Sequence, residues 1–463
     1  MGTKLAGYIY AGRCRNSSIK RGNALEEFQS DRSRIVFCSS FRRMMQKAQV
    51  FSLESNSSVR NRLTHSLEVA DVGKTLARKV GCALKDKGLA DDFDVSCIEA
   101  IVENACLIHD IGNPPFGHFG EEAIKRWCRE NQCIFEKGEN NLPLGIPDPC
   151  FYDLSHFDGN PQGFRIVTKL HAEKDEFSLN LTYSTLLSFL KYPCSNEEEK
   201  NTNNYKKIGI FSSEADRYKK ICDTTKHSYG KRYFLVYLME LADDICYCLS
   251  DIADAFEKRI VESRFFKEEF KKIIKAKNYE DSQFQKIIPE VPITNFSQQI
   301  SIPVCRECIE SAVKYYAENF DSYLNGEGNE LSGTIEESRW LECLKIFARK
   351  FIYTESEIQR IEIAGDKVVS ELLRHFGRLL RLSQKDFRYF CEKRENIKGK
   401  GYDLEWRIFN QLSPRMLEAY KSSLSKNSEE EKLLRCRFIV DYISGMTDQS
   451  ALQFYQNLMA IKL

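Results

Sequence analysis

Apolar residues recur at helical spacing along nearly the whole chain, and this pattern most limits the folds that it can adopt. Glycine and proline, which would interrupt such segments, number only 24 and 11 among 463 residues. They cluster between the apolar segments instead of recurring at the spacing of strands. The pattern therefore predicts an all-α fold. Residues 207–212 are the one place where it allows a small β-hairpin.

Ten segments carry the strongest helical pattern. Helices are predicted at 63–84, 95–109, 121–130, 179–191, 233–256, 304–323, 356–380, 385–395, 413–424 and 429–442. Two polar stretches, 138–163 and 195–231, interrupt them and are predicted to be loops. Because the candidate metal ligands described below fall between residues 65 and 243, residues 1–300 are predicted to form one core. Residues 301–463 are then a helical extension that packs on it.

The bulk composition is that of an ordinary globular protein. A formal net charge of +1 gives no overall preference for nucleic acid or for a membrane surface. No segment approaches the ~18 apolar residues of a membrane span, and the first residues lack the apolar core of a secretory signal. The 17 scattered cysteines are therefore expected to be reduced and mostly buried, as in a cytoplasmic protein.

A histidine and an aspartate stand side by side at the end of a predicted helix. The pair is His109-Asp110, and Gly112 and Pro114 behind it favour a turn of the chain. Because the backbone turns there, the imidazole and the carboxylate can both reach one cation. The apolar helix before the pair would hold it rigidly. This arrangement predicts a divalent-metal site.

Two further candidate ligands lie on other predicted helices. His65 is one turn into the helix at 63–84, and Asp243 lies beside Asp244 within the apolar helix at 233–256. Carboxylates in the middle of an apolar helix are costly to bury unless they are paired or bind a metal. The sequence alone does not decide between Asp243 and Asp244 as the ligand, although the helix face that Asp243 shares with Tyr247 favours Asp243.

The four candidate ligands, His65, His109, Asp110 and Asp243, form a mixed nitrogen and oxygen donor set. Such a set suits one divalent cation, with Mn²⁺ or Mg²⁺ favoured here and Fe²⁺ or Zn²⁺ as alternatives. It leaves coordination positions open for water and for a phosphate oxygen, as hydrolysis requires. The predicted chemistry is metal-dependent phosphate hydrolysis.

The chain resembles the HD-domain superfamily and, within it, the deoxyguanosinetriphosphate triphosphohydrolases. The matching runs lie at 31–51, 62–69, 109–121, 157–166, 179–183, 190–193, 242–247 and 441–448. The run HDIGNPPFGHFGEEAI, which begins at His109, is the most specific of them, whereas an isolated His-Asp pair would be a weak signal. The resemblance covers nearly the whole chain.

The resemblance implies hydrolysis of dGTP, with other dNTPs left open, to the deoxynucleoside and tripolyphosphate. In this reaction water attacks the α-phosphorus. His118 is implied to act in proton transfer, with Glu121 as the residue that orients it, and the spacing of three places both on one side of a helix. The implied substrate contacts are Gln49, Arg62, Asn160, Lys191, Tyr192, Tyr247 and Asp251.

The spacing of three of these positions agrees with a shared role in binding the sugar. Asp243, Tyr247 and Asp251 are four residues apart and therefore share one face of a helix. A tyrosine ring against the 2′ carbon would leave no room for a ribonucleotide hydroxyl, and a carboxylate can accept a hydrogen bond from the 3′-OH. This predicts a preference for deoxynucleotides.

The family also implies partners. A homo-oligomer, either hexamer or tetramer, is expected, and single-stranded DNA or a nucleotide is an expected effector; no membrane association is expected. The alternatives are another HD-type phosphohydrolase, such as a 5′-nucleotidase or phosphodiesterase, or a nucleotide- or DNA-responsive binding protein with a weak site. Turnover that a metal stimulates would separate the enzymes from the binding protein.

Overall fold

The computed structural model describes residues 3–132, 149–171, 177–279, 288–424 and 428–461. Within these residues the fold is all-α, as predicted, and it contains no β-sheet. The only β pairings there are two isolated bridges, Arg13 with Thr182 and Ala48 with Asn61. None of the described helices combines the length and the apolar composition that a bilayer crossing requires.

The contacts within the chain divide it into two compact units. The first consists of Met1–Asp110, Asn180–Pro193 and Arg217–Arg360. Its longer helices are α1 (Ala24–Phe37), α3 (Arg62–Asp86), α4 (Asp92–Ile108), α11 (Val236–Glu257), α12 (Ser263–Ala276), α14 (Ile302–Glu318) and α17 (Ser338–Phe351). Its shorter elements include α2 (Ser39–Arg43), α8 (Tyr183–Phe189), α15 (Phe320–Leu324) and α16 (Leu331–Thr334).

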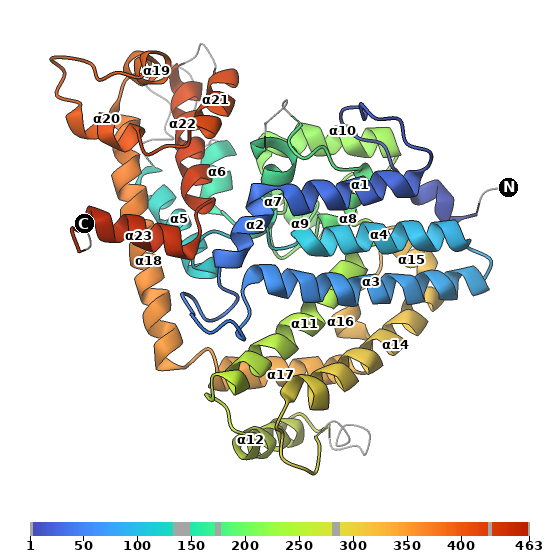
Figure 1. Cartoon of the computed structure of the whole chain (residues 1–463). Helices are drawn as coiled ribbons and strands as arrows, with labels where there is room; N and C mark the ends of the chain where they lie inside the picture. The colour runs from blue at the N-terminus through green and yellow to red at the C-terminus, as the bar shows by residue number, and fades with distance from the viewer. Residues whose placement is uncertain (1–2, 133–148, 172–176, 280–287, 425–427, 462–463) are drawn as a thin grey trace. The chain divides into compact units, whose positions relative to one another are not determined.

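Helices α3 and α4 form the scaffold of the first unit and lie side by side (Figure 1). Each begins with a capping box, centred on Asn61 for α3 and on Asp91 for α4, which satisfies backbone N–H groups of the first turn. Gly73 lets the two helices approach, because a Cβ there would lie 2.5 Å from the Cys106 sulfur. This close packing fixes the start of α3 relative to the end of α4.

The second unit consists of Ile111–Leu179, Cys194–Asp216 and Ile361–Leu463. Its helices are α5 (Gly117–Glu130), α6 (Pro149–Ser155), α7 (Gly159–Arg165), α9 (Glu197–Thr202), α19 (Gln384–Lys393), α20 (Asp403–Phe409), α21 (Pro414–Ser422), α22 (Ser428–Ser444) and α23 (Asp448–Leu458). Two further helices, α10 (Ala215–Thr225) and α18 (Ser356–Phe376), contribute to both units.

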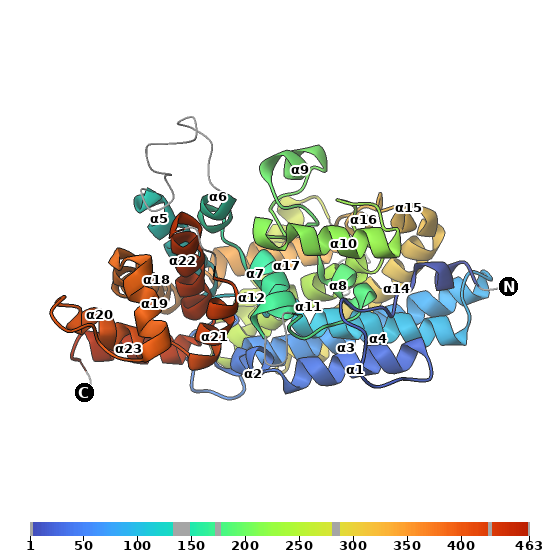
Figure 2. The same ribbon diagram turned by 90° about the horizontal axis from the view of Figure 1, so that it is seen from above.

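A buried ionic cluster links distant parts of the second unit. Arg165 on α7 contacts Asp441 on α22 at 2.7 Å and Glu214 at 2.6 Å, and all three side chains are almost fully buried. Figure 2 shows α22 beside α6 in the same unit. Removal of one member would leave an unpaired buried charge, so the cluster ties α22 to α7.

The predicted hairpin at 207–212 is wrong, because the structure has no strand there. The N–H groups of Gly209 and Ile210 both donate to the Cys194 carbonyl, and that of Ser212 donates to the Asp153 carboxylate. These donors are therefore used outside any strand ladder.

The two predicted loops are also partly helical. Residues 195–231 contain α9 and α10, which are short polar helices whose composition resembles that of a loop. In the stretch 138–163, residues 149–163 include α6 and most of α7, and residues 138–148 lie outside the described part of the chain. Short polar helices escape detection because few apolar positions reveal their period.

The long predicted helices are confirmed with small shifts of their ends. The helix predicted at 179–191 is shorter, Tyr183–Phe189, and the one predicted at 304–323 is divided at Asn319. The helix α12 was not predicted, although its buried residues Phe266, Phe270 and Ile273 have helical spacing. The division into a core of 1–300 and an extension of 301–463 stays a prediction.

Candidate functional site

Two histidines and one aspartate converge in the first unit. His65 lies in the first turn of α3, His109 caps the end of α4, and Asp243 comes from α11. Each offers one ligand atom, and these atoms all lie within 4.8 Å of one another. The Nε2 atoms of His65 and His109 are each 3.3 Å from Asp243 Oδ1. The packing of α3, α4 and α11 thus creates a group that could hold a metal.

The histidines present atoms that suit a cation. His109 Nδ1 lies 2.7 Å from the carbonyl oxygen of Cys106, and because a carbonyl only accepts, Nδ1 carries the hydrogen. His109 Nε2 is then a lone-pair donor, and it is buried without a hydrogen-bond partner among the described residues. In His65, Nε2 is the nitrogen that approaches Asp243, while Nδ1 is buried without a hydrogen-bond partner among the described residues. Buried nitrogens without partners are costly, and the fixed tautomer of His109 is the one that metal-binding histidines adopt.

Asp110 lies at the edge of this group. Its Oδ2 is 3.8 Å from His109 Nε2 and accepts a hydrogen bond from Arg62, which is on α3. Burial raises the pKa of Asp110, but Arg62 and His109 outweigh this effect and bring it to about 2. Asp110 is therefore ionised at neutral pH and can act as a ligand together with the three convergent residues.

Lys191 forms an ion pair with Asp243, as Arg62 does with Asp110. Its Nζ is 2.7 Å from Asp243 Oδ2. Burial raises the pKa of Asp243, yet Lys191 and His109 hold it well below its usual range. Two cations, Lys191 and Arg62, therefore stand next to the two ionised carboxylates.

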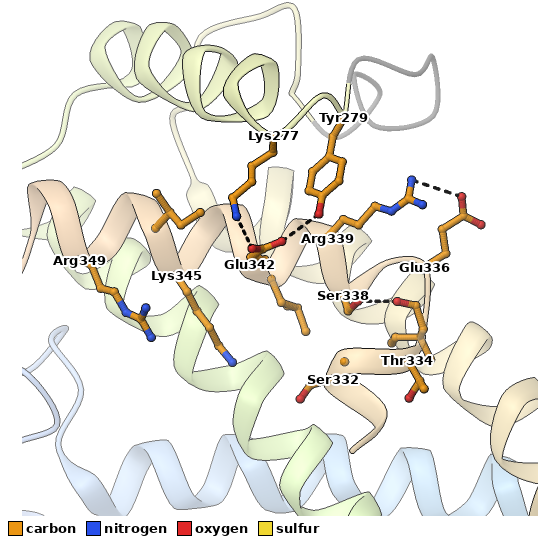
Figure 3. Close-up of a pocket in the computed structure, with 14 residues that line it drawn as sticks. Lys277, Tyr279, Ser332, Thr334, Glu336, Ser338, Arg339, Glu342, Lys345 and Arg349 are labelled. Atoms are coloured by element: carbon orange, nitrogen blue, oxygen red, sulfur yellow. Dashed lines mark hydrogen bonds and ion pairs between the residues drawn. The ribbon is translucent and has the colours of Figure 1, made fainter. Parts of the chain in front are cut away.

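The structure separates Asp243 from Asp244. Asp244 pairs with Lys345 of α17 at 2.8 Å, whereas Asp243 faces the histidines. Lys345 lines a pocket of about 670 Å³ beside α16 and α17 (Figure 3). Figure 3 also shows Lys277 reaching Glu342, at 2.6 Å. Since neighbouring residues on a helix point in directions about 100° apart, Asp243 and not Asp244 lies with His65 and His109 in the group that could hold a metal.

Tyr247 and Asp251 share a face of α11, as the spacing predicted, and a third residue joins them. The hydroxyl of Tyr353 lies 2.8 Å from that of Tyr247 and donates a hydrogen bond to Asp251 Oδ2. Asp251 is completely buried, and burial raises its pKa to about 7. Tyr353 was not predicted, because no motif surrounds it and it lies about a hundred residues from its partners.

Asp251 should make the stability of the protein fall as the pH rises from about 4 to about 7. In this window the unfolded carboxyl, with a pKa of about 3.9, loses its proton, while the folded one, with a pKa of about 7, keeps it. Folding then requires proton uptake, and its cost grows with pH until it levels off above pH 7. Asp251→Asn removes this titration.

The melting temperature of Asp251→Asn, relative to that of the wild type, should therefore be higher at pH 8 than at pH 4.5 when both proteins are measured without nucleotide by calorimetry. A difference between the two proteins that stays constant over this range would contradict the raised pKa.

His118 and Glu121 form a hydrogen-bonded pair in the second unit. Both lie near the start of α5, one helical turn apart, and His118 Nδ1 is 2.9 Å from Glu121 Oε2. The other carboxylate oxygen, Oε1, accepts the backbone N–H of Gly159 at 2.9 Å. Glu121 is buried, while 81% of the His118 side chain is exposed. A fixed carboxylate thus orients an accessible imidazole, which is the arrangement of a general acid or base.

The remaining predicted substrate contacts are Gln49, Tyr192 and Asn160, and they differ in whether their polar groups already have partners. Gln49 has a buried Oε1 without a hydrogen-bond partner among the described residues, and the Tyr192 ring lies 5.7 Å from the guanidinium of Arg232. Asn160, which is in the second unit, donates its side-chain N–H to Asp158 at 2.6 Å. Gln49 therefore has an acceptor to offer to a ligand, whereas the Asn160 amide already has a partner.

Comparison with known proteins extends these observations. The HD domain family model matches residues 62–142, and the phosphohydrolase-associated domain model matches residues 404–457. The deoxyguanosinetriphosphate triphosphohydrolases of Salmonella typhi and Salmonella paratyphi A are each 34% identical to this chain, over 95% of its length and 94% of theirs. That of Cronobacter sakazakii is 33% identical over the same shares. This chain therefore belongs to the HD-domain family of deoxyguanosinetriphosphate triphosphohydrolases.

Proposed function

We propose that this protein hydrolyses dGTP to deoxyguanosine and tripolyphosphate in a metal-dependent reaction in which water attacks the α-phosphorus. Membership of the family supports the substrate and the reaction. The structural observation that carries the proposal is the convergence of His65, His109 and Asp243 in a buried group. Other dNTPs are further candidate substrates.

The metal would be held by His65, His109, Asp110 and Asp243. The fit rests on the buried, unpartnered Nε2 of His109, on His65 Nε2, which lies 3.3 Å from Asp243 Oδ1, and on the ionised state of the two carboxylates. A divalent cation bound there would supply Lewis-acid activation of water and of the phosphate. The mixed donor set suits Mn²⁺ or Mg²⁺, with Fe²⁺ or Zn²⁺ as alternatives.

Arg62 and Lys191 are proposed to bind the phosphates. Each already contacts a carboxylate of the metal group, so each holds a positive charge at its edge. A planar guanidinium can bind two phosphate oxygens at once, whereas the ammonium of Lys191 acts as a point charge. Tyr192, which follows Lys191, Gln49 and Asn160 are proposed as further contacts with the nucleotide.

His118 is proposed to transfer the proton, either from the attacking water or to the leaving 5′ oxygen. The N–H at His118 Nδ1 donates a hydrogen bond to the Glu121 carboxylate. His118 Nε2 is then the nitrogen that can accept or release a proton. The N–H of Gly159 fixes the Glu121 carboxylate in turn. Glu121 is therefore proposed as the residue that orients His118.

Tyr247 and Asp251 are proposed to recognise the deoxyribose. Tyr353 supports both, because its hydroxyl contacts the two side chains. We expect Tyr247→Ala to lower the ratio of kcat/KM for dGTP to that for GTP by ~10-fold or more, within the ~10²-fold with which a pocket rejects an added hydroxyl. Tyr247→Phe keeps the ring and should keep the ratio. An unchanged ratio in Tyr247→Ala would contradict the role of the ring.

The family resemblance further supports a homo-oligomer, hexamer or tetramer, and an effector that is single-stranded DNA or a nucleotide. The scattered cysteines support a cytoplasmic location. Light scattering would give the oligomeric state, and the rate of dGTP hydrolysis with and without each effector would reveal activation.

The decisive test is product analysis by ion-exchange chromatography with dGTP and Mn²⁺ or Mg²⁺. The expected products are deoxyguanosine and intact tripolyphosphate. Formation of dGMP with pyrophosphate, or of phosphate alone, would instead favour another HD-type phosphohydrolase such as a 5′-nucleotidase. Binding of dGTP without turnover, even with single-stranded DNA or a second nucleotide present, would favour a nucleotide-responsive binding protein.

A further inference from the structure

The backbone just before His118 adopts a conformation that its local sequence does not favour. Phe116 has φ 60° and ψ 21°, in the left-handed region, and no side chain caps the helix that begins at Gly117. A residue with a Cβ is strained in this region, so contacts elsewhere must hold it there. Because His118 is the second residue of α5, its direction depends on this turn.

Two distant residues hold Phe116. Its backbone N–H donates to Asp448 Oδ1 at 3.0 Å, and Asp448 is the first residue of α23. Its ring and Cβ lie against Gly365 of α18, where an added Cβ would come within 2.5 Å of the ring and 2.6 Å of the Phe116 Cβ. Phe116, Asp448 and Gly365 are all buried. This hydrogen bond is buried, so its loss would leave the Phe116 N–H without an acceptor in the interior, which is costly.

We propose that Asp448 is a positioning residue for the reaction, which fixes the turn at Phe116 and thereby the direction of the His118 imidazole. Gly365 provides the space that the turn requires. The inference rests on the proposed role of His118. It gives the phosphohydrolase-associated segment, which includes Asp448, a part in catalysis without contact with the substrate.

Three variants at the start of α23 test the proposal. Asp448→Ala removes the acceptor, and we expect kcat to fall on the order of 10- to 100-fold, as for a misplaced catalytic group, with KM and bound metal nearly unchanged. Asp448→Asn keeps an oxygen acceptor and should recover most of kcat. Thr447→Ala is the matched control, because Thr447 caps the same helix by accepting the N–H of Ser450 at 3.1 Å. It should keep kcat within about 2-fold of wild type.

Hydrogen exchange supplies a readout that does not depend on activity. The peptide that contains Phe116 should exchange faster in Asp448→Ala than in wild type or Thr447→Ala, because its amide loses its acceptor. Gly365→Ala, a change that favours a helix by propensity alone, should also lower kcat and speed this exchange. It keeps the proposal testable if Asp448→Ala does not fold.

The outcomes distinguish failure of the positioning role of Asp448 from failure of the proposed dGTP hydrolysis. Unchanged kcat and exchange in folded Asp448→Ala would overturn the positioning role, and so would equal losses in Asp448→Ala and Thr447→Ala. If wild-type protein does not hydrolyse dGTP, the proposed function fails. The exchange data then still decide whether Asp448 holds the turn.

Discussion

Asp243→Asn is expected to abolish both metal binding and dGTP hydrolysis, whereas Asp244→Asn is expected to leave both nearly intact. The two residues are adjacent on α11, but Asp243 faces the histidines and Asp244 faces Lys345. Loss of residues that merely orient metal ligands weakens metal binding by ~10- to 100-fold, so loss of a ligand charge should exceed that range. The Asp244–Lys345 pair is partly exposed, and its loss should cost at most about 1 kcal/mol.

The measurement is metal content by mass spectrometry after dialysis against Mn²⁺, together with the rate of tripolyphosphate release. Circular dichroism shows whether each variant is folded. Normal metal content in Asp243→Asn, or loss of metal in Asp244→Asn alone, would contradict the assignment of the ligands.

His118→Ala is expected to lower kcat by roughly 10²- to 10⁴-fold without loss of metal, since a positioned acid or base contributes about that much. Glu121→Gln should have a smaller effect in the same direction, because the imidazole remains but loses the carboxylate that orients it. The exposed His118 side chain makes few packing contacts, so stability should change little.

Glu122→Gln is the control for these two variants. Glu122 directly follows Glu121 on α5, is exposed, and pairs with Lys125 at 2.8 Å. It should keep kcat within about 2-fold of wild type. Steady-state rates with dGTP, with metal content measured on the same samples, test the expected losses of kcat in His118→Ala and Glu121→Gln. A normal kcat in His118→Ala would remove this residue from the mechanism.

Local sequence patterns were sufficient for much of the fold, and they marked His65, His109, Asp110 and Asp243 as candidate ligands, whereas His118, Glu121 and the substrate contacts were implied by the family resemblance. The helices α3, α4 and α11 follow from apolar spacing, and Asn61 and Asp91 mark the starts of the first two. His109 was expected to end a helix before a turn, and it does. These features depend on residues within one or two helical turns, which is the range over which propensity and capping act.

Only the tertiary structure decided which distant side chains meet. The choice of Asp243 over Asp244 depends on the positions of α3, α4 and α17 around α11, because a helix presents adjacent residues in different directions. Tyr353 reaches Asp251 across about a hundred residues, and Asp448 reaches Phe116 across more than three hundred. By itself, the sequence determined the all-α class, most of the long helices and the family, but not the short polar helices or α12. The partners of those residues were decided by long-range packing, because contacts between distant segments exist only once the chain has folded.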